Sequence, residues 1–333
     1  MLLGVNTGIW FCLVILAVVL DWIVGDPRAL PHPIVFIGKW VGFLTKKLNC
    51  GRGRKAKGLL LWLLTLAATV AVVLAVQYLA YKIHPVVFYL VNLYFLASTI
   101  AAKCLKQEVM KVYDALRAED IPQGRVLVGY LVGRETSELG EGGLIRATVE
   151  TTAENTIDGV MAPIFYMVLG CFLWQLHPAL NPLVLAMAYK AVNTLDSMVG
   201  YIQEPYKDFG CVSAKIDDAV NFPIARLGSL LMLAGGLFLG YNTSDGWRIY
   251  RRDRKNHRSP NSANPESMVA GLLGIQLGGT NVYFGQVLEK PTIGDARRGL
   301  VYEDIKNTAD IMYAGEIVMV VLIMLIFVGL YLF

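Results

Sequence analysis

The sequence predicts an all-α polytopic membrane protein with roughly five to seven membrane segments, connected by cytoplasm-facing amphipathic helices and polar loops. Hydrophobic residues make up 55% of the 333 residues and charged residues only 17%, and the mean hydropathy is +0.51. A chain of this composition has too little polar surface for a soluble globule. We therefore expect one integral-membrane domain over residues 1–333, multi-pass in the cell membrane, with its main polar loops at 21–57, 103–158, 201–222 and 241–310.

Apolar runs long enough to cross a bilayer recur along the chain. They lie at 2–20, 58–81, 86–102, 160–176, 183–201, 222–240 and 311–333. A hydrocarbon core about 30 Å thick needs about 20 apolar residues in a helix. Segments 34–48 and 103–117 have the pattern of amphipathic helices. Lysines and arginines crowd the loop after the first of these, so the positive-inside rule places that loop in the cytoplasm and the amino terminus outside.

The modest net charge of +4 points to a bilayer as a partner rather than to nucleic acid. The basic residues lie in loops between apolar runs, where they suit an anionic membrane surface. The basic loop that follows the apolar run 222–240 should be cytoplasmic, as should the polar groups that precede this run. A single crossing at 222–240 would place the two on opposite sides, so the number of crossings around 183–240 stays open. Either that run is shallow or broken at Gly235 and Gly236, or one of the two preceding segments does not cross.

A polar stretch at 190–226 lies between apolar runs. One predicted helix carries Lys190, Asn193 and Ser197 on a single face with Asp196 beside them, and a second, short helix gathers Asp217, Asp218 and Asn221. Such groups bind cations and phosphates, and an ionisable residue at membrane depth is by default a functional-site hypothesis. The alternative is a solvated loop between two spans, but the density of acceptors in the second group favours a site.

Four charged residues recur at a helical spacing further upstream. Arg146, Glu150, Glu154 and Asp158 follow one another every four residues and would form one slowly drifting stripe on a helix. Like charges at this spacing destabilise an isolated helix. A compensating cation is therefore expected: Arg146 itself, a lysine from elsewhere, or a divalent metal with oxygen ligands. We favour a metal or a substrate cation.

Two further groups lie at predicted membrane boundaries. Asp26 and His32, with Arg28 between them, form either an ordinary turn or the entrance to a site. The segment Ser259-Pro260-Asn261-Ser262 precedes a predicted helix, where it offers an N-cap and a turn. Because arginines precede it, the same segment also suits a phosphate.

Five motifs resemble those of one known family, and they follow one another in the same order as in that family. They are GDPRALPHPIVFIGKWV, ETTAENTIDGVMAPIFY, KAVNTLDSMVGY, FGCVSAKIDDAVNFPIARL and RSPNSANPESMVAGLLGIQLGGTNVYFG. Together they resemble the adenosylcobinamide-phosphate synthase family of cobalamin biosynthesis, of the CbiB/CobD type, over nearly the whole chain.

The resemblance implies an ATP-dependent carbon–nitrogen ligase. Such an enzyme joins adenosylcobyric acid to (R)-1-amino-2-propanol O-2-phosphate, or to a related amino alcohol, and gives adenosylcobinamide phosphate. The corrinoid carboxylate needs activation, most simply as an acyl phosphate, because it has no adequate leaving group for an amine. ATP is then a co-substrate, and Mg²⁺ bridges its phosphates and neutralises developing charge.

Residue chemistry suggests roles for the charged and amide side chains. The predicted catalytic residues are Glu150, Glu154, Lys190, Asp217 and Asp218, and the predicted metal ligands are Glu150, Glu154, Asp158, Asp217 and Asp218. The predicted substrate-binding residues are Asp26, His32, Arg146, Asn155, Asn193, Asp196, Ser197, Asn221, Arg226, Ser259, Asn261, Ser262 and Glu266. Among these we expect phosphate to be bound by Lys190, Arg226 and the 259–262 turn, and corrin amides by the three asparagines 155, 193 and 221.

Two readings from other functional classes stay open. A membrane transporter or carrier of corrinoids would also use broken helices with polar groups at membrane depth. The other reading is a non-catalytic partner of a membrane cobamide-assembly complex. The clustering of motifs on one predicted side, the cytoplasmic one, favours the enzyme, for which homo-oligomers and other membrane cobamide-assembly enzymes are further expected partners.

Overall fold

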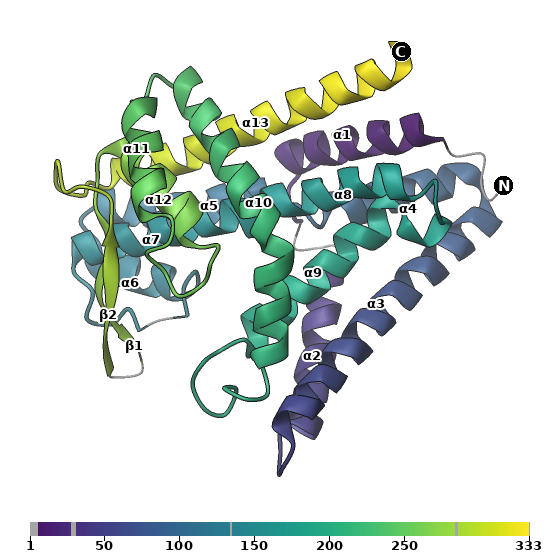
Figure 1. Ribbon diagram of the computed structural model, residues 1–333, viewed down its shortest axis with the longest axis horizontal. Helices are drawn as coiled ribbons and strands as arrows, with labels where there is room; N and C mark the ends of the chain where they lie inside the picture. Colours follow the sequence, from purple (N-terminus) through teal and green to yellow (C-terminus); the bar gives the residue numbers. More distant parts are fainter. Residues whose placement is uncertain (1–5, 28–30, 134, 284–285, 333) are drawn as a thin grey trace. The chain divides into compact units, whose positions relative to one another are not determined.

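The computed structural model describes residues 6–27, 31–133, 135–283 and 286–332. Helices make up most of this part of the chain (Figure 1), and the predicted all-α membrane class is confirmed. The described residues add one antiparallel hairpin, in which β1 (Leu277–Tyr283) pairs with β2 (Gln286–Ile293). Arg28, Arg134, Phe284 and Gly285, which fall in predicted loops or in the motifs above, lie outside the described residues.

The chain forms two compact units, each built from separate stretches of sequence. The first comprises Met1–Ala101, Ala162–Asn221 and Phe327–Phe333, and the second Ala102–Met161 and Phe222–Ile326. Helices of the first unit are α1 (Thr7–Ile23), α2 (Pro33–Leu48), α3 (Arg54–Ile83), α4 (Pro85–Ala97), α8 (Ala162–Leu173), the 3₁₀ turn η2 (Pro178–Leu180) and α9 (Pro182–Val199). Helices of the second unit are α5 (Ala102–Arg117), α6 (Ile121–Gly129), α7 (Glu141–Asn155), the π-helix η1 (Thr156–Met161), α11 (Thr243–Asp253) and α12 (Ala263–Leu273). Helices α10 (Cys211–Phe238) and α13 (Glu303–Leu332) contribute residues to both units. The single domain expected over 1–333 stays a prediction.

Five stretches of the described chain are long and apolar enough to cross a membrane. They are Arg54–Ile83, Pro85–Arg117, Glu141–Leu173, Cys211–Phe238 and Glu303–Leu330, and the shorter apolar helix Thr7–Ile23 accompanies them. The chain is therefore an integral membrane protein.

Helix α10 resolves part of the question about residues 183–240. It runs unbroken through Gly235 and Gly236, so the predicted break there is wrong. Helix α9 is not among the five candidate spans found in the described residues. By length and composition, the alternative in which one of the two preceding segments does not cross is thus favoured.

The short helix predicted around Asp217 is also wrong, because Asp217, Asp218 and Asn221 lie within the 28-residue helix α10. A proline removes a backbone donor and usually ends a helix. In this helix Pro223 is internal, and the Tyr166 hydroxyl donates to the nearby Val220 carbonyl at 2.8 Å. Pro223 therefore interrupts one backbone hydrogen bond without ending the helix, as membrane helices tolerate.

Prolines mark where several helices of the first unit begin. Pro33, Pro85 and Pro182 each occupy the first turn of a helix, where a missing N–H costs nothing. Inside the unit, Gln77 of α3 donates to Asn92 of α4 at 2.7 Å and to Asn181 at 3.1 Å. Asn181 donates back to Gln77 at 3.0 Å. This buried amide cluster ties α3 and α4 to the start of α9.

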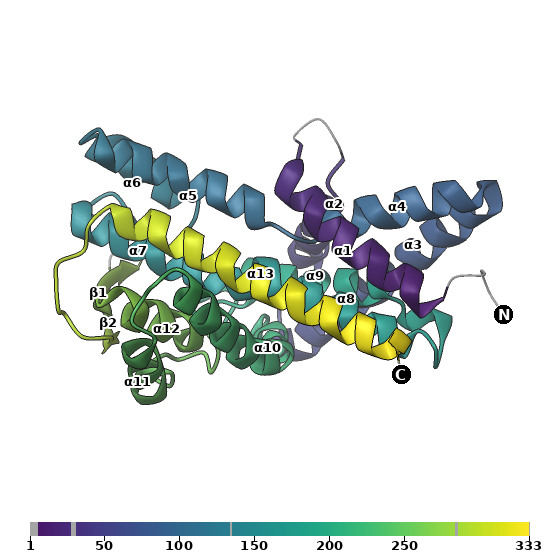
Figure 2. The same cartoon turned by 90° about the horizontal axis from the view of Figure 1, so that it is seen from above.

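In the second unit, α12 is buried along its whole length. It packs against α11 and α7, and the hairpin lies beside it in both views (Figures 1 and 2). Helix α11 is amphipathic and turns Gly246, Ile249 and Tyr250 inward. Gly271 allows the approach of α11, because a Cβ there would lie 2.7 Å from the Asp245 carbonyl oxygen.

Candidate functional site

The acidic helix α7 supports the polar site of the second unit. Two buried threonines of α7 and one directly after it donate to carbonyls one turn earlier: Thr148 to Leu144 at 2.8 Å, Thr152 to Thr148 at 2.6 Å and Thr156 to Thr152 at 2.7 Å. These bonds satisfy the hydroxyls inside the protein. They leave the glutamates of α7 to meet partners from other elements.

The predicted charged stripe holds for Arg146, Glu150 and Glu154 but not for Asp158. The first three lie on α7, whereas Asp158 falls in the π-helical turn Thr156–Met161. A π-helix closes its hydrogen bonds over five residues, so it shifts the following side chains off an α-helical stripe. Such turns occur frequently at functional sites.

Glu150 binds the backbone of the β-hairpin. Its side chain is 7% exposed, and its Oε1 accepts from the Gly278 N–H at 2.8 Å. Gly278 has φ +76°, and a Cβ on it would lie 2.3 Å from the Pro291 carbonyl oxygen. At the adjacent Gly279, φ is +81° and the Arg146 guanidinium lies 3.4 Å from the position of a Cβ. The two glycines thus let β1 approach Arg146 and Glu150 closely.

Glu154 binds the turn that was predicted to bind phosphate. Ser262 Oγ donates to Glu154 Oε1 at 2.7 Å, and Ser262, although at the N-cap position of α12, makes no side-chain cap bond. Ser262 thus occupies the N-cap position without capping α12, because its hydroxyl donates to the Glu154 carboxylate instead. Within the turn, the Asn261 N–H donates to Ser259 Oγ at 3.2 Å.

Arg226 holds the same turn from α10. Its guanidinium lies 3.4 Å from the Phe222 ring centroid and donates to the Phe222 carbonyl at 2.7 Å. It also donates to Asn261 Oδ1 at 3.4 Å and to the Pro260 carbonyl at 3.3 Å. The structure thus brings together Arg226, the 259–262 turn and Glu154, which the sequence had placed in three separate motifs. Glu266 lies in the first turn of α12 and is buried.

Other predicted residues of the second unit serve local structure. Asn155 Nδ2 donates to the Thr151 carbonyl at 2.9 Å and to Thr151 Oγ1 at 3.1 Å, so its amide is engaged by its own helix. Its assignment to a corrin amide stays a prediction.

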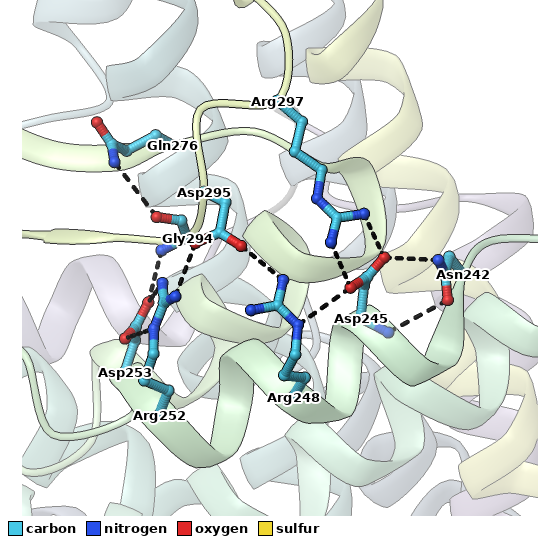
Figure 3. A network of polar contacts seen from close by, with 9 residues as sticks. All are labelled: Asn242, Asp245, Arg248, Arg252, Asp253, Gln276, Gly294, Asp295 and Arg297. Atoms are coloured by element: carbon cyan, nitrogen blue, oxygen red, sulfur yellow. Dashed lines mark hydrogen bonds and ion pairs between the residues drawn. The ribbon is translucent and has the colours of Figure 1, made fainter.

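Three arginines of the polar region 241–310 are paired with aspartates (Figure 3). The pairs are Arg248 with Asp245 and Asp295, Arg252 with Asp253 and Asp295, and Arg297 with Asp245. Burial alone would raise the pKa of the Asp253 carboxyl, but hydrogen bonds from Arg252 and the Gly294 N–H outweigh it and the pKa is lowered. The network ties α11 to the segment that follows β2.

A chain of hydrogen bonds orients Asp217 in the first unit. Tyr189 Oη donates to Asn221 Oδ1 at 2.9 Å, and Asn221 Nδ2 donates to Asp217 Oδ2 at 3.0 Å. Tyr166 stacks on Tyr189 with ring centroids 5.0 Å apart. All four side chains lie in the first unit, and Asn221 is only 1% exposed. The predicted grouping of Asp217 and Asn221 on one helix is thus present, and Asp218 beside them is half-buried.

The predicted face of α9 is present in the structure. Lys190, Asn193 and Asp196 are half-buried on this helix, and Ser197 is exposed. Ser197 Oγ donates to the Thr194 carbonyl at 3.0 Å. A Cβ at Gly200 would lie 1.9 Å from Asp196 Oδ1, so this glycine makes room for the carboxylate.

Asp26 and His32 form a pair at the start of α2, with 3.1 Å between Oδ1 and Nε2. Their side chains are 22% and 27% exposed. The adjacent Pro31 carbonyl accepts from Tyr94 Oη at 2.6 Å, which fixes this turn against α4.

The predicted metal ligands are carboxylates, and their arrangement can be compared with the ligands that Mg²⁺ uses. Among the residues that the structure describes, no three His, Cys, Asp or Glu side chains gather to hold a metal ion. Mg²⁺ bound to a nucleotide uses only one or two carboxylates together with phosphate oxygens and waters. Glu150 and Glu154, on successive turns of α7, offer two carboxylates of that kind.

Sequence reasoning missed Tyr189 and Gly278. Tyr189 stands next to Lys190 in an apolar run and has the pattern of a core aromatic residue. Gly278 lies in a glycine pair, which could have indicated a close backbone approach.

Comparison with known proteins places these residues in one family. A family model described as CobD/Cbib protein matches residues 14–312. The cobalamin biosynthesis protein CobD of Clostridium perfringens is 43% identical over 301 residues, which cover 90% of this chain and 92% of that protein. The cobalamin biosynthesis protein CbiB of Salmonella typhi is 42% identical over 308 residues, with 90% and 92% covered. CobD of Listeria monocytogenes is 43% identical over 301 residues, also with 90% and 92% covered. No solved structure matches the chain.

Proposed function

Because this chain belongs to the CobD/CbiB family, we propose that it is an ATP-dependent amide ligase of cobalamin biosynthesis. In this proposal it joins adenosylcobyric acid to (R)-1-amino-2-propanol O-2-phosphate, or to a related amino alcohol, and forms adenosylcobinamide phosphate. The observation that carries the proposal is the grouping of Arg226, the 259–262 turn and Glu154 within one unit, where a cation, hydroxyls and a carboxylate meet.

The chemistry requires activation before amide formation. Transfer of the γ-phosphoryl group of ATP to the corrinoid carboxylate gives an acyl phosphate and ADP. The amine then attacks the acyl carbon, phosphate leaves with the bonding electron pair, and the ammonium-derived proton is lost to a base. Mg²⁺, when bound to the nucleotide at Glu150 and Glu154, would neutralise charge on its phosphates.

The second unit supplies an anion-binding group in this scheme. Arg226 presents a planar guanidinium that is already stacked and hydrogen-bonded, so little side-chain entropy is lost when phosphate binds. The 259–262 turn adds hydroxyl and amide donors next to it. Glu154 orients Ser262 by accepting a hydrogen bond from its hydroxyl.

The first unit supplies groups for the ammonium and the corrinoid. Asp217 is a carboxylate oriented by Asn221 and Tyr189, and it suits an incoming ammonium that must be held and then deprotonated. Lys190 and Asn193 suit a phosphate and an amide. Asp26 and His32 would shape the entrance.

A cytoplasmic active site of a multi-pass cell-membrane protein is part of the proposal. It is supported by the lysines and arginines that flank the spans, since the positive-inside rule assigns such loops to the cytoplasm.

Replacement of Asp217 tests the proposal. Asp217→Asn keeps the shape and the bond from Asn221 but removes the negative charge, so we expect ligation to be lost while expression stays normal. Asp208→Asn is the matched control, because Asp208 lies in an exposed loop and pairs with Lys55 at 3.5 Å. Turnover is followed as corrinoid amide by mass spectrometry. Equal turnover in the two variants would remove Asp217 from the mechanism.

A further inference from the structure

An apolar pocket of about 740 Å³ lies within the first unit, among α2, α3, α4 and α9. Phe36, Ile37 and Trp40 of α2 form one wall, and small and branched residues of α3, including Val72, form another. Thr69 and Tyr94 carry the only hydroxyls among its lining residues. A volume in this range accommodates a small molecule. Because a polar ligand would lose hydration without gaining hydrogen bonds, the occupant must be largely hydrocarbon.

Residues of the pocket are open to the surroundings of the unit. Val72 is 61% exposed and Phe36 is 59% exposed, and α3 is one of the candidate membrane spans. A hydrocarbon chain from the bilayer can therefore reach the pocket sideways, without passing through water. The hydrocarbon available beside this pocket is therefore that of the bilayer lipids.

Helix α2 adds positive charge at the edge of the pocket. Lys39 Nζ lies 5.8 Å from the ring centroid of Phe36, and Lys47 Nζ lies 4.3 Å from that of Phe43. Trp40 stacks on Phe43. In the described part of the chain neither lysine forms an ion pair. A face of lysines and aromatic rings is typical of a helix at the level of lipid headgroups.

The length of α3 is sufficient for one of its ends to reach the lipid headgroups. Its 30 residues make a helix about 45 Å long, whereas the hydrocarbon core is about 30 Å thick. Part of α3 therefore tilts or extends beyond the core. Helix α2, which packs along α3, can then meet the headgroup region.

We propose that this pocket binds one acyl chain of an anionic phospholipid, whose phosphate lies beside Lys39. The apolar walls select the chain and the lysine selects the charge of the headgroup. None of the lining residues is assigned to ligation, although Pro31 and Pro33 of the lining flank His32, and lipid binding is measured without any substrate of the enzyme.

Native mass spectrometry of the full chain in detergent tests the proposal. The probes are dioleoyl phosphatidylglycerol, dioleoyl phosphatidylcholine and glycerol phosphate, which has the anionic group but no chain. We expect the wild type to retain one phosphatidylglycerol in preference to phosphatidylcholine, and no glycerol phosphate. Val72→Trp fills the pocket and should abolish retention, whereas Leu79→Trp places the same ring on an exposed part of α3 outside the pocket and should preserve it.

A charge variant tests the headgroup. Lys39→Gln should lower the preference for phosphatidylglycerol over phosphatidylcholine about fivefold, the effect of one lysine near an anionic surface. If Val72→Trp does not fold, Ala68→Phe fills the pocket from the same helix, and its retention of phosphatidylglycerol is measured instead. Equal retention in the filled and control variants, equal retention of both lipids by the wild type, or binding of glycerol phosphate alone would overturn the proposal.

Discussion

Gly278→Ala is the substitution that most directly tests how the β-hairpin is attached to α7. Gly278 has φ +76°, and its N–H donates to the buried Glu150 carboxylate at 2.8 Å. A Cβ would lie 2.3 Å from the Pro291 carbonyl oxygen, which is backbone and has no side chain to rotate away. The methyl group therefore displaces β1 from β2, from Glu150, or from both.

The magnitude follows from two costs and one gain. The left-handed conformation costs a residue with a Cβ about 1–2 kcal/mol, and loss of a hydrogen bond to a charged group costs about 1.5–3 kcal/mol. Restriction of the unfolded chain returns only about 0.4–1 kcal/mol. The two destabilising effects exceed the stabilising one, and we expect a net loss of about 2–4 kcal/mol in the free energy of unfolding.

Thermal unfolding in detergent measures this loss. We expect the Tm of Gly278→Ala to fall by roughly 4–8 °C, by the scaling for large domains. Gly299→Ala is the matched control, because a Cβ there meets nothing within 4 Å, and its Tm should stay at or slightly above that of the wild type. A Tm for Gly278→Ala equal to that of the control would refute the account of this attachment.

Three further predictions concern the amide cluster, the aspartate network and the anion site. Gln77→Leu removes the amide that joins α3 to α4 and α9, and should lower the free energy of unfolding by about 1–2 kcal/mol; a change below about 0.3 kcal/mol in denaturant titrations would contradict it. Because the pKa of Asp253 is lowered by folding, its contribution to stability is complete above its unfolded pKa of about 4 and is lost as the pH falls below that value. The Tm measured from pH 7 down to pH 3 should therefore drop at the acid end, and an equally steep drop in Asp253→Asn would count against this carboxyl as the cause. Arg226→Lys keeps the charge but loses the planar fork, so kcat/KM for ATP should fall about tenfold, while Arg251→Lys, outside the turn, should leave it unchanged; a similar value in both variants would exclude Arg226 from phosphate binding.

Much of the helical fold could be predicted because its signals are local. The apolar run 58–81 and the amphipathic segment 34–48 correspond to α3 (Arg54–Ile83) and α2 (Pro33–Leu48) within a few residues. Basic residues and prolines bound both segments. One helix was predicted with the wrong length: Asp217 was placed on a short helix, whereas α10 continues through Pro223 to Phe238.

The candidate site could be predicted only as separate residue groups. Arg226, Glu154 and Ser262 were each proposed from their chemistry, but their contacts join segments 35 and 108 residues apart in the sequence, which no local pattern encodes. The β-hairpin was missed because its glycine pair at 278–279 interrupts the alternation of a strand. Asp158 was placed on the acidic stripe because a π-helical turn has no signature in spacing alone.

The central claim is that the protein forms an amide at the expense of ATP, and one measurement tests it most directly. Detergent-purified wild-type protein is incubated with adenosylcobyric acid, aminopropanol phosphate, ATP and Mg²⁺, and the corrinoid product and ADP are quantified together. We expect adenosylcobinamide phosphate to appear with ADP in equal amounts over many turnovers, and no amide and no multiple-turnover ADP to form when the amine is replaced by propanol phosphate. Binding of the corrinoid without formation of the amide would contradict the ligase and would favour a corrinoid carrier or a non-catalytic partner.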